Sequence, residues 1–302
     1  MISISRFLKN NPLLKREKLL RLVEDLYSHT SGLLVGVSKR SDEWESLKLL
    51  GKDTVIVDSH REHYKVFTAD QVISRELYIR GQFDLKKLQR AHALLLRLNV
   101  GRGQTLLDVG ANLGSICIPA VSRGYFKMAI AIEANPRSAE ALRLNVALNN
   151  LEPFIVVHEI VAGKANQGPV SVSEDELNLG ASRVVDNIGS GNSAEVRALD
   201  ELVERIDEIG LVFMDVEGYE GNVLLGAQSL LATKIPIALE FSPNLLIAHI
   251  SKQDFCRLFS EYSGCYSLND PVAEFWPIHK LGLLWDWYFN EPASEQTDLL
   301  FV

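Results

Sequence analysis

Acidic residues at the ends of two predicted strands are the residues of this sequence best suited to bind a charged ligand. The first strand runs from Thr105 to Val109 and contains Asp108. The chain then turns through Gly110 and Gly114 into a helical segment. Glycines let the backbone turn tightly and let a ligand approach it closely. This layout is typical of a nucleotide-type cofactor site in a doubly wound sheet.

The second acidic residue, Glu133, follows the apolar run Lys127 to Ile132 and lies nineteen residues after Gly114. At this distance the second strand of such a fold brings a carboxylate to the ribose hydroxyls of a cofactor. A carboxylate beside the glycine turn would repel the pyrophosphate of NAD, whereas S-adenosylmethionine (SAM) carries a sulfonium and an ammonium group. Asp108 and Glu133 together therefore predict a site for SAM.

The composition limits the classes of partner and the compartment. The net charge of −8, from 31 basic and 39 acidic residues, argues against nucleic acid as a partner. Cys117, Cys256 and Cys265 lie far apart without CxxC spacing, so we expect reduced thiols and no zinc site. No apolar run is long enough to span a membrane, and no signal peptide is evident, so the predicted location is cytoplasmic. The oligomeric state stays open.

The order of predicted elements divides the chain into a small N-terminal α/β extension, residues 1–65, and a cofactor domain, residues 66–302. The extension contains helix Leu13–Tyr27, strand Leu33–Val37, helix Asp42–Leu50 and strand Thr54–Asp58. In the domain, strands and helices alternate, which predicts an α/β fold with a largely parallel sheet. The predicted strands are 105–109, 127–132, 154–158, 211–216, 235–241, 264–268 and 297–302, and the main helices are 85–98, 114–123, 137–149, 199–208, 220–232 and 251–260.

A polar segment, residues 161–196, interrupts this alternation. It is rich in Gly, Ser and Asn and is long for a plain connection. We expect a hairpin around residues 166–168 and a functional loop over the site.

Five short blocks of the chain occur in the order seen in one known family. They are Leu-Asp-Val-Gly-Ala-Asn-Leu-Gly at 107–114, Ile-Glu-Ala-Asn-Pro at 132–136, Leu-Asp-Glu-Leu at 199–202, Met-Asp-Val-Glu-Gly-Tyr-Glu at 214–220 and Glu-Phe-Ser-Pro at 240–243. With these blocks, residues 70 to 302 resemble the FkbM-type SAM-dependent methyltransferases. The resemblance implies a class I methyltransferase fold, which is Rossmann-like: a doubly wound, seven-stranded sheet whose last strand, 297–302, is antiparallel.

The same residues can be given roles in cofactor binding from their chemistry. Gly110, Asn112 and Gly114 would let the methionine part of SAM lie against the backbone, with Asp108 behind the turn. Glu133 would accept hydrogen bonds from the two ribose hydroxyls, and Asn135 would reach the adenosine side.

Two carboxylates, Asp215 and Glu240, end neighbouring predicted strands and are the candidate catalytic residues. Asp215 would also lie beside the cofactor, where the methyl group leaves. One carboxylate could be the general base for a hydroxyl acceptor, its pKa raised by burial and a like charge. Alternatively, both could hold a magnesium ion together with Asn244. We favour the site without a metal. Glu217 and Glu220 lie at a helix start, where negative charge is favourable in any case.

Other residues are weaker candidates. His60 and His63 lack a third metal ligand and are predicted to lie at the surface. Residues 80–83 could contact the cofactor, as implied by the family, and residues 178–182 could contact the acceptor. The aromatic residues Trp276, Trp285, Trp287 and Tyr288 could line a sugar subsite, although ordinary core packing is favoured.

The leading functional hypothesis is methyl transfer from SAM to a hydroxyl of a sugar, glycan or specialised metabolite, an acceptor class implied by the resemblance. An N-methyltransferase would use the same cofactor residues. An NAD-linked oxidoreductase or epimerase is disfavoured by Asp108, and a SAM-binding module without catalysis remains as a further alternative.

Overall fold

A computed structural model describes residues 39–59, 61–173, 177–178, 182–185, 193–269, 274–290 and 296–302. The chain divides into two compact units, residues 1–52 and 53–302. The described part of the first unit contains a helix over residues 39–49. The predicted helix Leu13–Tyr27 and strand Leu33–Val37 lie outside the described residues. The expected boundary at residue 65 falls within the second unit.

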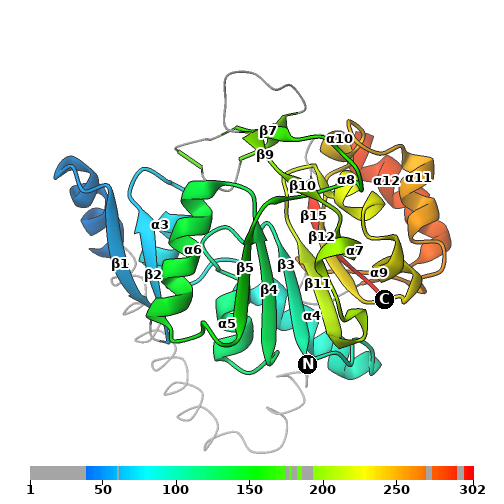
Figure 1. The fold of residues 1–302 in the computed structure, drawn as a ribbon, viewed down its shortest axis with the longest axis horizontal. Helices are drawn as coiled ribbons and strands as arrows, with labels where there is room; N and C mark the ends of the chain where they lie inside the picture. The colour runs from blue at the N-terminus through cyan, green and yellow to red at the C-terminus, as the bar shows by residue number, and fades with distance from the viewer. Residues whose placement is uncertain are drawn as a thin grey trace, which may run out of the picture. The chain divides into compact units, whose positions relative to one another are not determined.

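The second unit is built around an eight-stranded sheet with the strand order β14-β13-β15-β12-β11-β3-β4-β5 (Figure 1). Its strands are β3 (Thr105–Val109), β4 (Met128–Glu133), β5 (Ile155–Glu159), β11 (Ile209–Met214), β12 (Ile237–Phe241), β13 (Gly264–Ser267), β14 (Phe275–Pro277) and β15 (Thr297–Phe301).

The direction of the strands confirms the predicted class I topology. Strands β5, β4, β3, β11 and β12 run parallel to one another. Strand β15 is antiparallel to its two neighbours, β12 and β13. The seven predicted strands are all present. An eighth short strand, β14, extends the edge by pairing antiparallel with β13.

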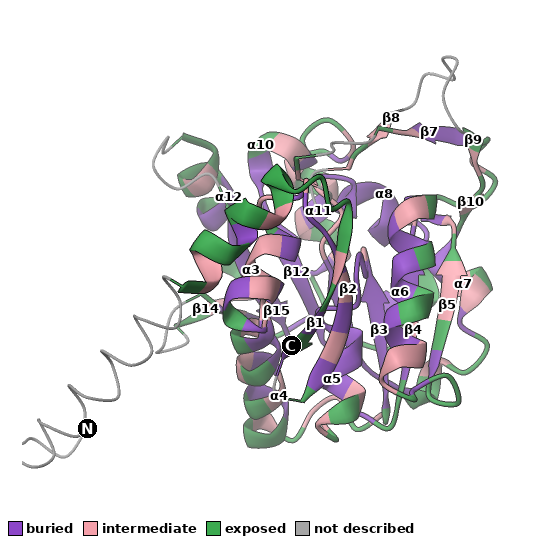
Figure 2. Cartoon of the chain, turned by 90° about the vertical axis from the view of Figure 1, so that its left-hand side faces the viewer, coloured by how far each residue is buried: buried purple, intermediate pink, exposed green. Residues whose placement is uncertain are grey.

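The central strands are buried along their whole length, which explains their continuous apolar sequence. Every residue of β3, β11 and β12 is buried, and Figure 2 shows β3 and β12 in purple. Parallel strands covered on both faces have this pattern. The polar residues Asp108 and Glu240 within these strands are therefore exceptions that require partners.

Helices flank the sheet and connect its strands. They are α3 (Ile73–Arg80), α4 (Leu85–Leu98), α5 (Cys117–Ser122), α6 (Pro136–Leu148), α7 (Leu199–Leu202), α8 (Glu220–Leu225), α9 (Gln228–Ala232), α10 (Pro243–Leu246), α11 (Lys252–Leu258) and α12 (Leu281–Asn290), with short 3-10 turns η2 (Ile206–Glu208) and η3 (Ile278–Lys280). None of the helices in the described ranges is both long and apolar enough to cross a bilayer.

Two of the predicted helices are wrong in extent. The helix expected over 199–208 is α7 followed by η2, and the helix expected over 220–232 is broken into α8 and α9. At this break, a side chain on Gly226 would collide with the carbonyl oxygen of Gly163. The break thus lets the backbone approach the segment that follows β5, a contact that periodicity does not reveal.

The polar segment after β5 forms two small sheets. Strands β6 (Val161–Ala162) and β10 (Val196–Arg197) pair in parallel, and β7 (Val170–Val172) pairs with β8 (Val184–Val185) and β9 (Ser193–Ala194). The hairpin expected around residues 166–168 is wrong, because β6 and β7 flank that turn but pair with other strands. We call residues 161–197 the excursion.

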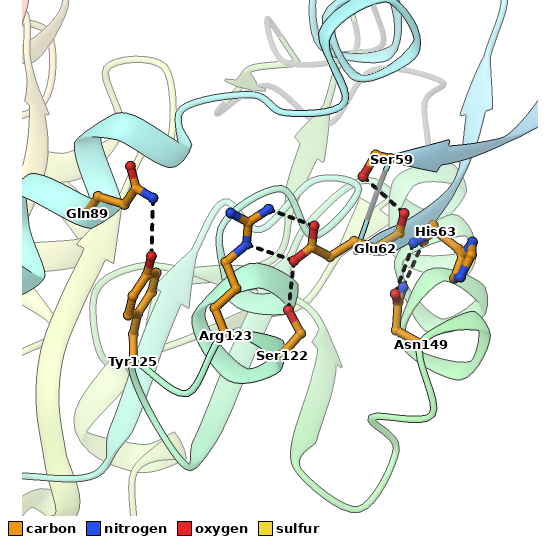
Figure 3. A network of polar contacts seen from close by, with 8 residues as sticks. All are labelled: Ser59, Glu62, His63, Gln89, Ser122, Arg123, Tyr125 and Asn149. Atoms are coloured by element: carbon orange, nitrogen blue, oxygen red, sulfur yellow. Dashed lines mark hydrogen bonds and ion pairs between the residues drawn. The ribbon is translucent and has the colours of Figure 1, made fainter.

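The hairpin of β1 (Thr54–Ser59) and β2 (Glu62–Phe67) belongs to the second unit and is fastened to it by side chains. Asn149 of α6 accepts from the N–H of His63 at 2.9 Å and donates to its carbonyl at 2.8 Å. Asn145, one turn earlier, makes the same pair of bonds to Lys65. Buried Glu62 binds Arg123 and Ser122 at the end of α5 (Figure 3).

Candidate functional site

A cavity of about 280 Å³ lies at the carboxyl ends of the central strands. Its walls come from β3, β4 and β12, from the turn after β11, from α3 and α4, and from the excursion. The predicted site residues that line it are Gly110, Asn112, Glu133, Asp215 and Glu240. In open α/β sheets, ligands bind at this edge, where the strand order reverses between β3 and β11.

The glycine turn after β3 is shaped by its neighbours. Gly110 has a φ of +86°, and a side chain there would collide with the carbonyl oxygen of Asp215. Gly114 has a φ of +89°, and a Cβ would lie 2.6 Å from Ile118 and 2.8 Å from Leu142. The two glycines therefore allow close contacts with β11 and with the helices, while the turn itself faces the cavity.

Asp108 lies behind this turn and does not line the cavity. Its Oδ2 accepts from the backbone N–H of Cys117 at 3.0 Å, at the start of α5. Burial raises the pKa of Asp108 to about 7, and the bonds from Cys117 oppose this rise. Asp108 thus fixes the turn against the helix, as expected for a residue behind the turn.

Glu133 and Asn112 form a polar wall where the cavity meets β4 and the turn after β3. We name this part of the cavity the cofactor end, after the role expected for these two residues. One oxygen of Glu133 accepts from the N–H of Asn112 at 2.7 Å, and the other accepts from the N–H of Asn135 at 2.8 Å. Burial raises the pKa of Glu133, while these N–H donors lower it. A carboxylate has about four acceptor sites, so each oxygen can still accept one further bond.

The cofactor end has polar capacity that the protein itself does not use. The side-chain oxygen of Asn112 is buried without a hydrogen-bond partner from any residue that the structure describes, and the residue is 8% exposed. Buried polar atoms are normally satisfied. The orphaned oxygen of Asn112 and the remaining acceptor sites of Glu133 fit a ligand with hydroxyl and ammonium donors, and SAM carries both.

Asn135 lies outside the cavity lining and caps α6. Its Oδ1 accepts from the N–H groups of Arg137 and Ser138, and its Nδ2 donates to Ser182 at 3.4 Å. Ser182 does line the cavity. Asn135 therefore reaches the site through the excursion.

Three carboxylates converge at the opposite end of the cavity, which we call the acceptor end. Asp215 and Glu217 follow β11, Glu240 lies on β12, and one oxygen from each lies within 4.8 Å of the others. The Oε2 of Glu240 is buried and has no hydrogen-bond partner among the described residues. Asn244, the expected companion of Asp215 and Glu240, is exposed and does not line the cavity.

Lysine 87 enters the acceptor end from α4. The Nζ of Lys87 lies 2.8 Å from Asp298 and 3.1 Å from Asp84, and the strand register pairs Asp298 with Glu240. Burial lowers the pKa of Lys87, but the two carboxylates more than offset this and raise it above its ordinary value. The sequence analysis missed Lys87, Asp84 and Asp298. The one available signal was an Asp inside the apolar strand 297–302.

Crowded negative charge perturbs the carboxylates of the acceptor end. Burial, and then the neighbouring Glu240 and Asp298, raise the pKa of Asp215 well above its ordinary value. Burial, followed by Glu220 and Glu217, raises the pKa of Glu240 to about 8. This end of the cavity therefore holds more carboxylates than its cations can compensate.

The remaining candidates take different places. Glu220 accepts from the N–H groups of Val216 and Gly218, so it holds the turn after β11. Phe83 lines the cavity, whereas Arg80 pairs with Glu76 at 2.9 Å. Asn178 and Ser182 line the cavity, and residues 179–181 lie outside the described part of the chain.

The aromatic candidates and His63 do not line the cavity. Trp285 is buried against Phe241 and Phe255, and Tyr288 packs against Phe241, so these two belong to the core. None of the four aromatic residues suggested for a sugar subsite lines the cavity. His63 lies 3.8 Å from Asp58, and His60 is outside the described residues.

Solved structures of several proteins, among them two methyltransferases, are similar to this chain. The m1A22 tRNA methyltransferase TrmK of B. subtilis is 14% identical with a TM-score of 0.39, and the match covers 72% of this chain and 64% of that one. The precorrin-6y C5,15-methyltransferase of Geobacter metallireducens is 15% identical with a TM-score of 0.36, and the match covers 70% of this chain and 87% of that one. P. horikoshii TYW2, solved in complex with MeSAdo, is 12% identical with a TM-score of 0.38, and the match covers 82% of this chain and 70% of that one. With TM-scores below 0.5, these similarities do not by themselves assign the chain to a family.

A family model gives that assignment. Residues 108–256 match the methyltransferase FkbM domain. The matched stretch begins at Asp108 and contains Glu133, Asp215 and Glu240, which confirms the resemblance seen in the sequence blocks. SAM is the expected cofactor of this family. The chain carries this domain and is a SAM-dependent methyltransferase.

Proposed function

We propose that the protein methylates a hydroxyl group of a sugar, glycan or specialised metabolite. The observation that carries this proposal is the division of a single cavity into two ends. Glu133 and Asn112 offer unused acceptor positions at one end, and Asp215 and Glu240 present carboxylates at the other.

At the cofactor end, the chain would bind and orient SAM. The free acceptor positions of Glu133 suit two ribose hydroxyls, and the orphaned oxygen of Asn112 suits a further donor. The backbone at Gly110 has no side chain to exclude the ligand, and Asp108 and Asn135 hold the surrounding elements in place. When bound, SAM supplies a methyl group on a sulfonium, and transfer breaks the S–C bond as the O–C bond forms.

At the acceptor end, the carboxylates would orient the hydroxyl and take its proton. A hydroxyl must lose its proton as the O–C bond forms, and positioned carboxylates commonly accept it. Asp215 adjoins the glycine turn, since its N–H donates to the carbonyl of Val109 at 3.0 Å. Within the acceptor end it therefore borders the glycine turn, and it is our main candidate for a catalytic residue, with Glu240 beside it.

The charge of this end disfavours a nucleic acid as acceptor. Asp84, Asp215, Glu217 and Glu240 line the cavity with a single lysine, and phosphate groups would be repelled. Methylation of an amine is the second candidate reaction, because the same carboxylates would attract a cationic group.

A cytoplasmic location stays a prediction that follows from the three free thiols.

Labelled SAM distinguishes these reactions. We expect incubation with a panel of hydroxylated sugars and metabolites to transfer the label to an oxygen, located by fragmentation of the product in a mass spectrometer. Transfer to nitrogen would favour the second candidate. Normal SAM binding without transfer across the panel would contradict an enzymatic role of this kind.

A further inference from the structure

The turn after β11 presents Glu217 to the acceptor end. Glu217 has a φ of +54°, which is uncommon for a residue other than glycine, and Gly218 follows with +97°. Buried Glu220 holds this turn by accepting from the N–H groups of Val216 and Gly218, at 2.9 and 3.4 Å. The chain thus maintains an unfavourable backbone conformation that brings a third carboxylate beside Asp215 and Glu240, and such conformations gather at functional sites.

The three carboxylates have little positive charge to neutralise them. Lys87, the cation in the cavity wall, bonds Asp84 and Asp298. Arg183 lies 4.0 Å from Glu217, and its side chain is 53% exposed, so solvent weakens its effect. Within the described residues, these are the cations that act on the group.

Glu240 provides an independent sign that something is bound there. It is 7% exposed, it lines the cavity, and its Oε2 has no hydrogen-bond partner in the part of the chain that the structure describes. An isolated buried carboxylate is costly unless it is paired or coordinates a metal. Its position beside two further carboxylates excludes a simple anion as the missing partner.

The spacing of the oxygens fits a cation. Three atoms no more than 4.8 Å apart leave a point within about 2.8 Å of all of them. Oxygen ligands of Ca²⁺ lie at about 2.3–2.6 Å and those of Mg²⁺ at about 2.0–2.1 Å, so small side-chain movements suffice. Sites built from carboxylates alone suit these hard ions and Mn²⁺.

We propose that Asp215, Glu217 and Glu240 bind a divalent cation, Mg²⁺, Mn²⁺ or Ca²⁺, at the acceptor end of the cavity. The sequence favours a site without metal and suggests Asn244 as the third ligand only for the alternative with a magnesium ion. The structure supplies Glu217 instead, which has the charge that such an ion requires.

The use of this ion rests on the proposed function. An acceptor hydroxyl bound to the ion would become more acidic, since a divalent cation stabilises the developing negative charge on oxygen. Its proton would pass to a carboxylate oxygen not bound to the ion, as the O–C bond forms and the S–C bond of SAM breaks. The existence of the ion site itself does not depend on which acceptor is used.

Binding of Mn²⁺ to the full chain tests the proposal without any acceptor. We expect electron paramagnetic resonance to show that each chain binds one Mn²⁺ ion in a saturable way. Added Mg²⁺ should displace this Mn²⁺ ion. Glu217→Gln and Glu240→Gln should each weaken Mn²⁺ binding by at least about tenfold, as losses around a metal site do. The control is Glu261→Gln, which changes an exposed carboxylate 3.7 Å from Lys234 and should leave binding unchanged.

The same samples distinguish failure of this proposal from failure of the proposed function. Absence of saturable Mn²⁺ binding, or equal binding in wild type and both variants, would overturn the ion site. Circular dichroism identifies a misfolded variant, and Glu217→Gln decides the result if Glu240→Gln fails to fold. Binding of S-adenosylhomocysteine, measured by calorimetry, reports on the cofactor end whichever result the metal gives.

Discussion

The two ends of the cavity use carboxylates in opposite ways. At the cofactor end, both oxygens of Glu133 accept backbone N–H groups, so the side chain is fixed and its charge is supported. At the acceptor end, Asp215, Glu217 and Glu240 lie close to each other, and no described residue forms a hydrogen bond with the Oε2 of Glu240. One end is preorganised by the backbone, and the other holds charge that the protein does not neutralise.

This difference suggests a division of labour between the ends. A carboxylate held by backbone donors costs little to bury and offers a rigid acceptor for hydroxyl groups. Carboxylates that lie close together repel each other, which destabilises the protein without a ligand. A bound cation or acceptor reduces this repulsion. We therefore expect changes at the first end to affect cofactor affinity and changes at the second to affect turnover.

The largest effect should come from Asp215→Asn, which removes a carboxylate from the acceptor end. We expect kcat to fall about 100-fold or more, within the range typical of a lost proton-transfer group, with little change in the affinity for S-adenosylhomocysteine. Release of S-adenosylhomocysteine with an accepted substrate measures the rate. Exposed Asp207 supplies the control, Asp207→Asn. An unchanged kcat would remove Asp215 from the chemistry.

Glu133→Ala should have the next largest effect, at the other end. Hydrogen bonds to a charged acceptor contribute about 1.5–3 kcal/mol each, so loss of two should weaken S-adenosylhomocysteine binding about 100-fold. Calorimetry measures the affinity. The matched control is Glu159→Ala, since Glu159 is the register partner of Glu133 on β5 and pairs with Arg143 at the surface. Equal affinity in Glu133→Ala and wild type would break the comparison.

Asp108 gives a smaller effect that depends on pH. Its pKa of about 7 in the folded protein exceeds the value near 4 expected when unfolded, so the folded state holds a proton that the unfolded state releases. Its contribution to stability is complete below about pH 4 and is lost as the pH rises through about 7. Urea unfolding of the ligand-free protein at pH 5 and 8 should show this loss, on the order of a few kcal/mol.

Asp108→Asn is the matched variant for this effect, because its amide oxygen can still accept from Cys117. We expect the difference in stability between pH 5 and 8 to become smaller in the variant. The same pH dependence in both proteins would show that other groups, such as Glu220, carry it.

The smallest effect should come from Asn149→Ala, far from the cavity. The change removes two hydrogen bonds to the backbone of His63, so the free energy of unfolding should fall by about 1–2 kcal/mol. The affinity for S-adenosylhomocysteine should stay unchanged. Gln89→Ala, which removes an exposed contact with Tyr125, serves as the control and should cost less. A loss of cofactor affinity in Asn149→Ala would connect the hairpin to the site.

The cofactor end could be predicted from the sequence because its parts are close together in the chain. A strand, two glycines and the next strand suffice to bring Asp108, Asn112 and Glu133 to one edge, and the spacing alone indicates this. The sequence could not indicate that Asp108 faces α5, since the direction of a side chain at a turn depends on tertiary contacts.

The acceptor end could be predicted only in part. Asp215 and Glu240 end adjacent strands, which the alternation of elements reveals. Lys87 and Asp298 meet through the antiparallel last strand and the packing of α4, at a sequence separation of more than two hundred residues. Glu217 reaches the cavity through a positive φ that no local motif specifies.

Calorimetric titration of the purified protein with S-adenosylhomocysteine, and separately with NAD, tests the central claim most directly. We predict saturable binding of S-adenosylhomocysteine that Glu133→Ala weakens about 100-fold, and no binding of NAD. Binding of NAD with no response to S-adenosylhomocysteine would contradict it.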